Sequence, residues 1–143
     1  MNRLLRIVVV IPAIIFVMTG IGYILDPANT AAQFGMPLLE GLGQSSQIGT
    51  LAAFFFTAGF CVLLATTTGK SFWYYPAAML TGLTATFRVI AWLVHDATLA
   101  TDQILPEVIF TFLFLYAATR LKKRLISGIS TSPFIRTLRA VES

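Results

Sequence analysis

The chain has 143 residues, of which 57% are hydrophobic and 11% are charged. A water-soluble protein of this size buries only about 68–70% of its unfolded surface, so its interior is too small for this many apolar side chains. The net charge of +4 does not indicate nucleic-acid binding, because the basic residues lie at the ends of apolar runs. The composition therefore excludes an ordinary soluble domain and predicts a protein that sits largely in lipid.

The first apolar run covers residues 4–25 and is long enough to cross a hydrocarbon core of about 30 Å as a helix. A cleaved signal peptide is the alternative, because Arg3 and Arg6 give a basic start and small residues follow at 30–32. The run is longer than the usual signal-peptide core of about 7–15 residues. We therefore expect a retained transmembrane helix.

The segment after this run predicts a short helix on the outer side of the membrane. Asp26 can cap it, Pro27 suits its first position, and Gly35 is placed to end it. Ala31 and Phe34 are expected to rest on the outer interface. An interfacial helix is the first interpretation, and a lid over the bundle is the alternative.

Three further apolar runs predict three more spans, at residues 48–68, 72–94 and 104–119. The aromatic cluster at 72–75 is typical of a membrane interface. Residues 1–124 are therefore expected to form an all-α membrane domain, an antiparallel bundle of four transmembrane helices.

Acidic and basic residues separate almost completely between the two ends of this predicted bundle. The basic end includes Lys70 and the residues near both termini, whereas nearly all the acidic residues fall toward the other end. The positive-inside rule, which depends on Lys and Arg in short loops, predicts that the basic end is cytoplasmic. Both termini are therefore expected in the cytoplasm.

Residues 125–143 predict a basic, amphipathic cytoplasmic tail with a helix that starts at Ser132 and Pro133. We expect this tail to lie on anionic headgroups, and contact with a partner's cytoplasmic surface is the alternative. The basic residues expected to make either contact are Lys122, Lys123, Arg124, Arg136 and Arg139.

Arg88 lies inside the third predicted span, where a cation costs about 2.5–3.5 kcal/mol on insertion scales and usually has a partner. Trp92 and His95 fall on the same helix face, because they follow Arg88 at successive spacings of four and three residues. Glu107, near the outer start of the fourth span, and Asp96 are the candidate acidic partners.

Two interpretations of this cluster follow. In the first, an ion pair between Arg88 and Glu107 fixes how the third and fourth spans pack. In the second, a polar pocket in the outer half of the bundle binds an anionic or carbonyl-bearing lipophile, such as a lipid headgroup or a quinone. The residues of that pocket would be Arg88, Trp92, His95, Asp96 and Glu107.

The sequence contains no signature of catalysis or of a resident cofactor. His95 is the only histidine and Cys61 the only cysteine, so one chain supplies no bis-histidine haem site, disulfide or cluster of metal ligands. A nucleophile elbow and a phosphate-binding loop are also missing from the sequence. We predict no enzyme activity, no metal and no cofactor, with a bound lipid or quinone as the alternative.

Several short motifs are spread over residues 1–124: the basic start at 2–6, Leu25-Asp26-Pro27, Phe34-Gly35, Arg88 with Asp96, and Glu107. With these motifs the chain resembles a family of small bacterial four-helix integral membrane proteins of unknown function. The chain departs from the family pattern at His95-Asp96-Ala97, which lacks a glycine beside the acid. The resemblance implies the four-helix fold and a bacterial inner membrane, and it implies no activity.

The small size, the lack of a reactive constellation and the basic tail predict a non-enzymatic accessory or assembly subunit of a larger membrane complex. Its expected partners are the lipid bilayer and other integral membrane subunits, with no nucleic acid. The alternative function is that of a binding protein or carrier for a small lipophile in the outer half of the bundle. A transporter is less favoured, because four spans enclose little aqueous volume.

Overall fold

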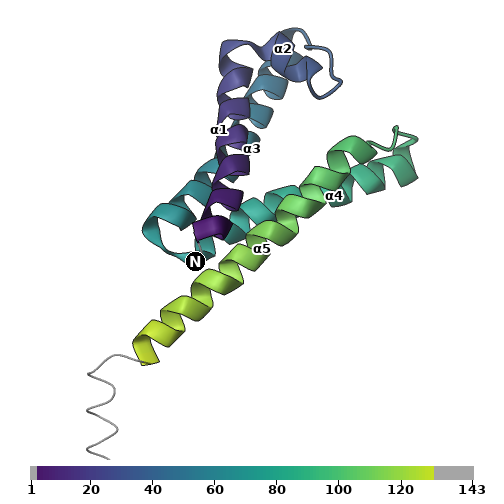
Figure 1. The fold of residues 1–143 in the computed structure, drawn as a ribbon. Helices are drawn as coiled ribbons and strands as arrows, with labels where there is room; N and C mark the ends of the chain where they lie inside the picture. Colours follow the sequence, from purple (N-terminus) through teal and green to yellow (C-terminus); the bar gives the residue numbers. More distant parts are fainter. Residues whose placement is uncertain (1–2, 131–143) are drawn as a thin grey trace, which may run out of the picture.

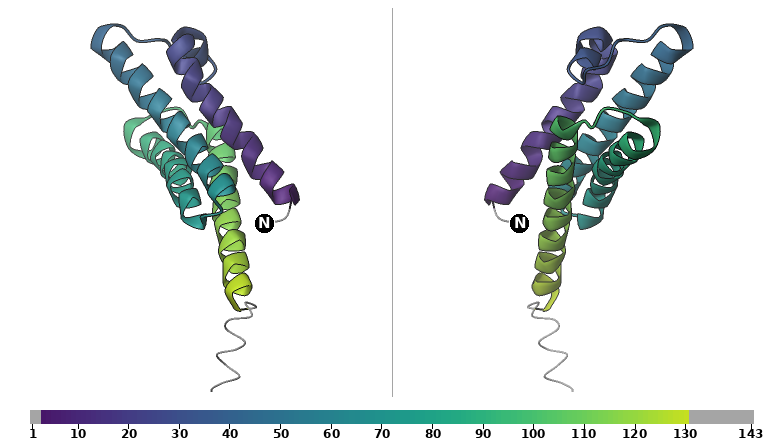
Figure 2. Two further views of the ribbon diagram at one scale, coloured as in Figure 1. Left: turned by 90° about the vertical axis from the view of Figure 1, so that its left-hand side faces the viewer. Right: turned by 90° about the vertical axis from the view of Figure 1, so that its right-hand side faces the viewer.

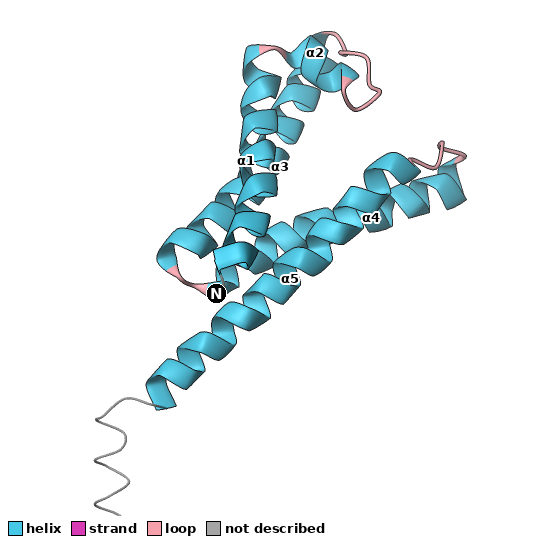
Figure 3. Cartoon of the chain, in the orientation of Figure 1, coloured by secondary structure: helices cyan, strands magenta, loops and turns pink. Residues whose placement is uncertain are grey.

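The computed structural model describes residues 3–130, with side chains for residues 3–122, and this part of the chain is helical apart from short connections (Figure 3). Its elements are α1 (Arg3–Leu25), α2 (Pro27–Ala32), α3 (Gly41–Thr68), the 3-10 turn η1 (Ser71–Trp73), α4 (Tyr74–His95) and α5 (Thr101–Ser130). Four helical segments of this part are long and apolar enough to span a membrane: Arg3–Leu25, Gly41–Thr68, Ser71–His95 and Thr101–Lys122. The protein is therefore a multi-pass membrane protein with an all-α architecture.

The four long helices form two antiparallel hairpins, α1 with α3 and α4 with α5 (Figure 1). The hairpins meet near Lys70 and η1, which connect them, and diverge toward the opposite end, where α2 lies (Figure 2). We call these the Lys70 end and the α2 end. The first described residues lie at the Lys70 end and α5 runs toward it, as an even number of crossings requires.

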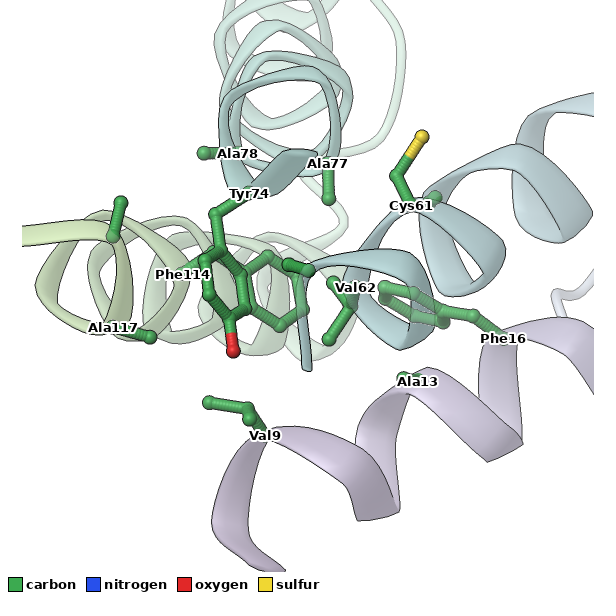
Figure 4. Close-up of a cluster of buried hydrophobic side chains, with 13 residues drawn as sticks. Val9, Ala13, Phe16, Cys61, Val62, Tyr74, Ala77, Ala78, Phe114 and Ala117 are labelled. Atoms are coloured by element: carbon green, nitrogen blue, oxygen red, sulfur yellow. The ribbon is translucent and has the colours of Figure 1, made fainter. Parts of the chain in front are cut away.

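The hydrophobic core lies at the Lys70 end, where the two hairpins touch (Figure 4). Each long helix contributes a fully buried side chain to it: Val9, Val62, Tyr74 and Phe114. Buried alanines on α4 and α5 lie beside these larger side chains and let the helices approach closely.

Two glycines bring the backbones of α1 and α3 into direct contact. A Cβ atom on Gly59 would overlap the carbonyl oxygen of Ala13 and lie 2.8 Å from the nitrogen of Val17. A Cβ on Gly20 would lie 2.8 Å from the nitrogen of Phe56. Small residues thus allow close helix packing inside this hairpin, as glycines do between transmembrane helices.

Most apolar side chains of the spans point away from the core. In the most apolar stretch of each span, only 22% to 33% of the residues are buried. Leaving such a surface in water would cost about 25 cal/mol for each Å². Lipid must therefore cover it.

The helix boundaries differ from the sequence prediction at two places. Helix α3 begins at Gly41 rather than at residue 48. Gln47 therefore lies inside the helix and fastens the preceding loop to it: its Oε1 accepts from Leu39 N at 2.9 Å and its Nε2 donates to Pro37 O at 3.1 Å. Helix α5 continues past residue 119 to Ser130, since leucine, lysine and arginine are good helix formers.

The helix expected after the first span is confirmed as α2. Asp26 accepts from Asn29 N at 3.3 Å at the helix start, and Pro27 takes the first helical position. Gly35 follows with φ of +68°, a conformation that glycine adopts without strain. Ala31 does not rest on the interface as expected; it is fully buried beside Tyr23 and Ala52.

Candidate functional site

A cavity of about 300 Å³ lies between the two hairpins at the α2 end, where they diverge. We call it the wedge cavity. Its aromatic wall and floor come from three helices: Phe16 of α1, Phe54 and Phe55 of α3, and Phe110 of α5. The rings of Phe16 and Phe110 meet edge to face, with centroids 5.2 Å apart. Phe16 also belongs to the core cluster and Phe110 packs against it, so this side of the cavity borders the core.

The segment that follows α2 contributes to the lining of the wedge cavity. Phe34 lines it, with its ring 5.0 Å from Phe55 and 6.2 Å from Tyr23. Gln103 of α5 also lines the cavity, and its Nε2 donates to the carbonyl oxygen of Phe34 at 3.1 Å. This hydrogen bond ties the two hairpins together at the α2 end.

The ion pair expected between α4 and α5 is present in the wall of the wedge cavity. Arg88 Nε donates to Glu107 Oε1 at 3.1 Å, and the two side chains are 32% and 16% exposed. Arg88 lies seven residues before the end of α4, which places it about 10 Å from that end at the rise of a helix. Both charges therefore lie within the candidate membrane spans.

One atom of this pair has no partner. Glu107 Oε2 is buried and makes no hydrogen bond within the described part of the chain. A buried acceptor without a partner has lost its hydrogen bonds to water without replacement. This loss costs roughly 1–3 kcal/mol, and more for a charged group. Glu107 lines the wedge cavity, but its Oε2 atom is itself covered by protein atoms.

Two threonines fix α4 against α5 below the ion pair. Thr81 Oγ1 and Thr111 Oγ1 lie 2.8 Å apart, and Thr111 Oγ1 donates to the carbonyl oxygen of Glu107 at 2.7 Å. Thr81 is buried and lines the wedge cavity. This chain of contacts sets the position of the helix turn that carries Glu107.

The structure does not bring all the predicted pocket residues together. Trp92, His95 and Asp96 are exposed and do not line the wedge cavity. Asp96 instead follows the end of α4 in the left-handed conformation, with φ of +51°, a position that usually carries glycine. Shared spacing placed Trp92 and His95 on the face of Arg88, but both side chains are exposed in the structure.

The basic tail falls mostly outside the described side chains. Lys122 is exposed on α5. Lys123 and Arg124 belong to the helical backbone of α5, and their side chains are not described. Arg136, Arg139 and the helix expected after Pro133 lie outside the described residues.

Sequence reasoning missed Phe34, Phe55 and Gln103 as cavity residues. Phe55 stands between two other phenylalanines in an apolar run, so the local sequence does not distinguish it as a cavity residue. Gln103 lies just before the fourth predicted span, and its partner lies 69 residues earlier in the chain. A polar residue one turn before Glu107 was the available signal.

Among the described residues, no group of three or more His, Cys, Asp or Glu side chains could hold a metal ion. The wedge cavity instead combines aromatic rings with one ion pair, an arrangement suited to binding an amphiphile. No family model, curated protein or solved structure matches this chain.

Proposed function

We propose that this protein binds a small lipophile, a lipid or a quinone, in the wedge cavity. The observation that carries the proposal is the partly exposed Arg88 guanidinium, of which described residues engage only Nε, in the wall of a cavity that several phenylalanine rings line. Ligand pockets typically have volumes of about 300–1,000 Å³ and apolar linings with a few placed polar groups. The wedge cavity, at about 300 Å³, lies at the small end of that range.

The proposal includes a location and an orientation. The protein would reside in a bacterial inner membrane with both termini in the cytoplasm, since basic residues gather at the Lys70 end and acidic residues at the α2 end. The wedge cavity would then open in the outer half of the bilayer. No catalytic step is proposed.

Bound lipophile in protein extracted together with native lipid tests the proposal. The two variants to compare are Arg88→Gln and the matched control Arg120→Gln, whose guanidinium contacts the hydroxyl of Tyr116 toward the Lys70 end. Mass spectrometry of the extracted lipids and quinones should show about tenfold less bound lipophile for Arg88→Gln alone. Unchanged binding with lower thermal stability would mean that the ion pair serves packing only.

A second candidate function is that of an accessory or assembly subunit of a larger membrane complex. It is favoured by a hollow of about 440 Å³ on the α4/α5 hairpin, lined partly by the small residues Gly82, Ala85 and Thr86. Small residues let a neighbouring transmembrane helix approach closely. Purification in mild detergent followed by mass spectrometry tests this function, and a monodisperse monomer without a co-purifying protein would count against it.

A further inference from the structure

We infer that the ligand of the wedge cavity carries a long hydrocarbon chain, and that this chain lies in a groove on α1 beside α2. This inference rests on the proposed function, because it names the class of lipophile for the same site. The alternative is a compact lipophile that fits wholly inside the wedge cavity. A second hollow next to the cavity favours the ligand with a chain.

This second hollow has a volume of about 300 Å³ and lies on α1, next to α2. We call it the α1 groove. Four residues line the groove and not the wedge cavity: Ile14, Met18, Gly22 and Thr30. Three further residues line both spaces: Ile15, Thr19 and Gln33. The wedge cavity and the α1 groove are therefore neighbours with a common boundary.

The common boundary lies at the surface of the protein. Ile15 is 56% exposed and Gln33 is also exposed, so neither side chain belongs to a buried wall. A chain can therefore pass over these side chains from the cavity into the groove without crossing the packed interior. The hollow on the α4/α5 hairpin differs, because it shares no lining residue with the wedge cavity.

The lining of the α1 groove suits hydrocarbon. The Met18 side chain is 59% exposed and offers an apolar surface. Both hydroxyl groups of the groove are engaged within the protein: Thr19 Oγ1 donates to a carbonyl oxygen one turn earlier at 2.9 Å, and Thr30 Oγ1 donates to Asp26 O at 2.8 Å. Neither hydroxyl therefore needs a hydrogen bond from a ligand. The amide of Gln33 lies at the boundary with the wedge cavity.

The length of the α1 groove matches a lipid chain in one leaflet. Ile14 is the middle residue of α1, and Gly22 follows it by eight positions, toward the α2 end. Eight positions correspond to about 12 Å along a helix. Half of the hydrocarbon core of a bilayer measures about 15 Å. The groove thus runs from near one end of the span to its middle, as a hydrocarbon chain does in one leaflet.

The volume of the wedge cavity also favours a ligand that extends beyond it. At about 300 Å³, the cavity lies at the lower limit for pockets that enclose most of a ligand. A lipid with a long chain does not fit inside. Its head group would meet the N–H groups of Arg88 that no described residue engages, and its chain would continue over the boundary into the groove. Lipids with acyl chains and quinones with prenyl chains share this chemistry.

Tryptophan substitutions in the groove test the inference. Met18→Trp fills the groove without changing a residue of the wedge cavity, and Ile11→Trp is the matched control on α1, because Ile11 lines neither space. Met18 and Ile11 are 59% and 55% exposed, so both variants should fold.

The measured quantity is the lipophile whose retention depends on Arg88. Each variant is extracted together with native lipid, and mass spectrometry compares its bound lipids and quinones with those of Arg88→Gln. We expect about tenfold less of this lipophile in Met18→Trp and an unchanged amount in Ile11→Trp, because a chain forced into a filled groove strains the site. The masses also distinguish the two sources of the chain, an acyl lipid and a prenyl quinone.

A second variant protects the test against a folding defect. Ile14→Trp fills the same groove from its other end and should give the same loss. Thermal unfolding followed by circular dichroism shows which variants keep the native fold, and only those are compared.

The outcomes separate this inference from the proposed function. Full retention of the Arg88-dependent lipophile in Met18→Trp, or an equal loss in Ile11→Trp, would overturn the inference and leave the wedge cavity as a binding site. Equal amounts in all variants, Arg88→Gln included, would mean annular lipid only and would overturn both.

Discussion

The two ends of the bundle are held together in different ways. At the Lys70 end, Val9, Val62, Tyr74 and Phe114 pack all four helices into one apolar core. At the α2 end the hairpins diverge, and a hydrogen bond from Gln103 to the Phe34 carbonyl joins them across a cavity. Dense packing therefore fixes one end and leaves the other with a space for a ligand. Substitutions at each end should have different effects.

The largest effect is expected from Phe114→Ala in the core. Phe114 is fully buried, and removing its ring leaves a void that the surrounding helices fill only in part. The free energy of unfolding should fall by about 3 kcal/mol, measured by titration with a denaturing detergent. Phe112→Ala is the control on the same helix, since Phe112 is 68% exposed. Equal losses for the two variants would contradict a core confined to the inside of the bundle.

A smaller loss is expected from Gly59→Ala in the α1/α3 hairpin. The added Cβ would overlap the backbone of Ala13, so the two helices must separate, at a cost of about 1–3 kcal/mol. Gly49→Ala, in the same helix, meets nothing within 4 Å and should not destabilise the protein. Thermal unfolding followed by circular dichroism compares the two. The hairpin contact would be refuted by an unchanged melting temperature for Gly59→Ala.

Thr81→Val tests the contact between α4 and α5 below the cavity. It removes the hydroxyl that lies 2.8 Å from Thr111, and such interhelical hydrogen bonds contribute about 0.6 kcal/mol on average. Thr86→Val is the control, because the Thr86 hydroxyl bonds only to a carbonyl of its own helix among the described residues. Detergent titration should place the Thr81 variant below the control in stability, and the reverse order would argue against an interhelical role.

Gln103→Leu should lower stability modestly and alter the α2 end most. It removes the hydrogen bond to the Phe34 carbonyl oxygen, which should lower the free energy of unfolding by about 0.5–1.5 kcal/mol. With Cys61 replaced by alanine, spin labels at Asn29 and Leu99 allow the separation of the two hairpins to be measured. We expect a longer or broader distance distribution for Gln103→Leu than for Gln44→Leu. Identical distance distributions would show that this hydrogen bond does not hold the two hairpins together at the α2 end.

Local rules predicted much of this molecule. Four spans follow from the lengths of the apolar runs, and the start of α2 follows from Asp26 and Pro27. The pairing of Arg88 with Glu107 could be predicted because two opposite charges at similar depth in lipid have few other partners.

The divergence of the hairpins could not be predicted from the same information. It depends on which apolar side chains meet across the bundle, and long apolar runs are compatible with many such arrangements. The wedge cavity and its residues Phe34, Phe55 and Gln103 follow from this divergence. For the same reason, Trp92 and His95 were assigned to a pocket that the structure builds without them.

The separation of Arg88 and Glu107 by 19 residues has a consequence for biosynthesis. Because α4 is made before α5, Arg88 reaches the membrane while Glu107 is still to be synthesised, a delay of about 1–4 seconds at roughly 5–20 residues per second. An unpaired arginine resists insertion by about 2.5–3.5 kcal/mol during that interval. Helix α4 is therefore expected to wait at the translocon until α5 arrives, so that the two helices enter the bilayer together.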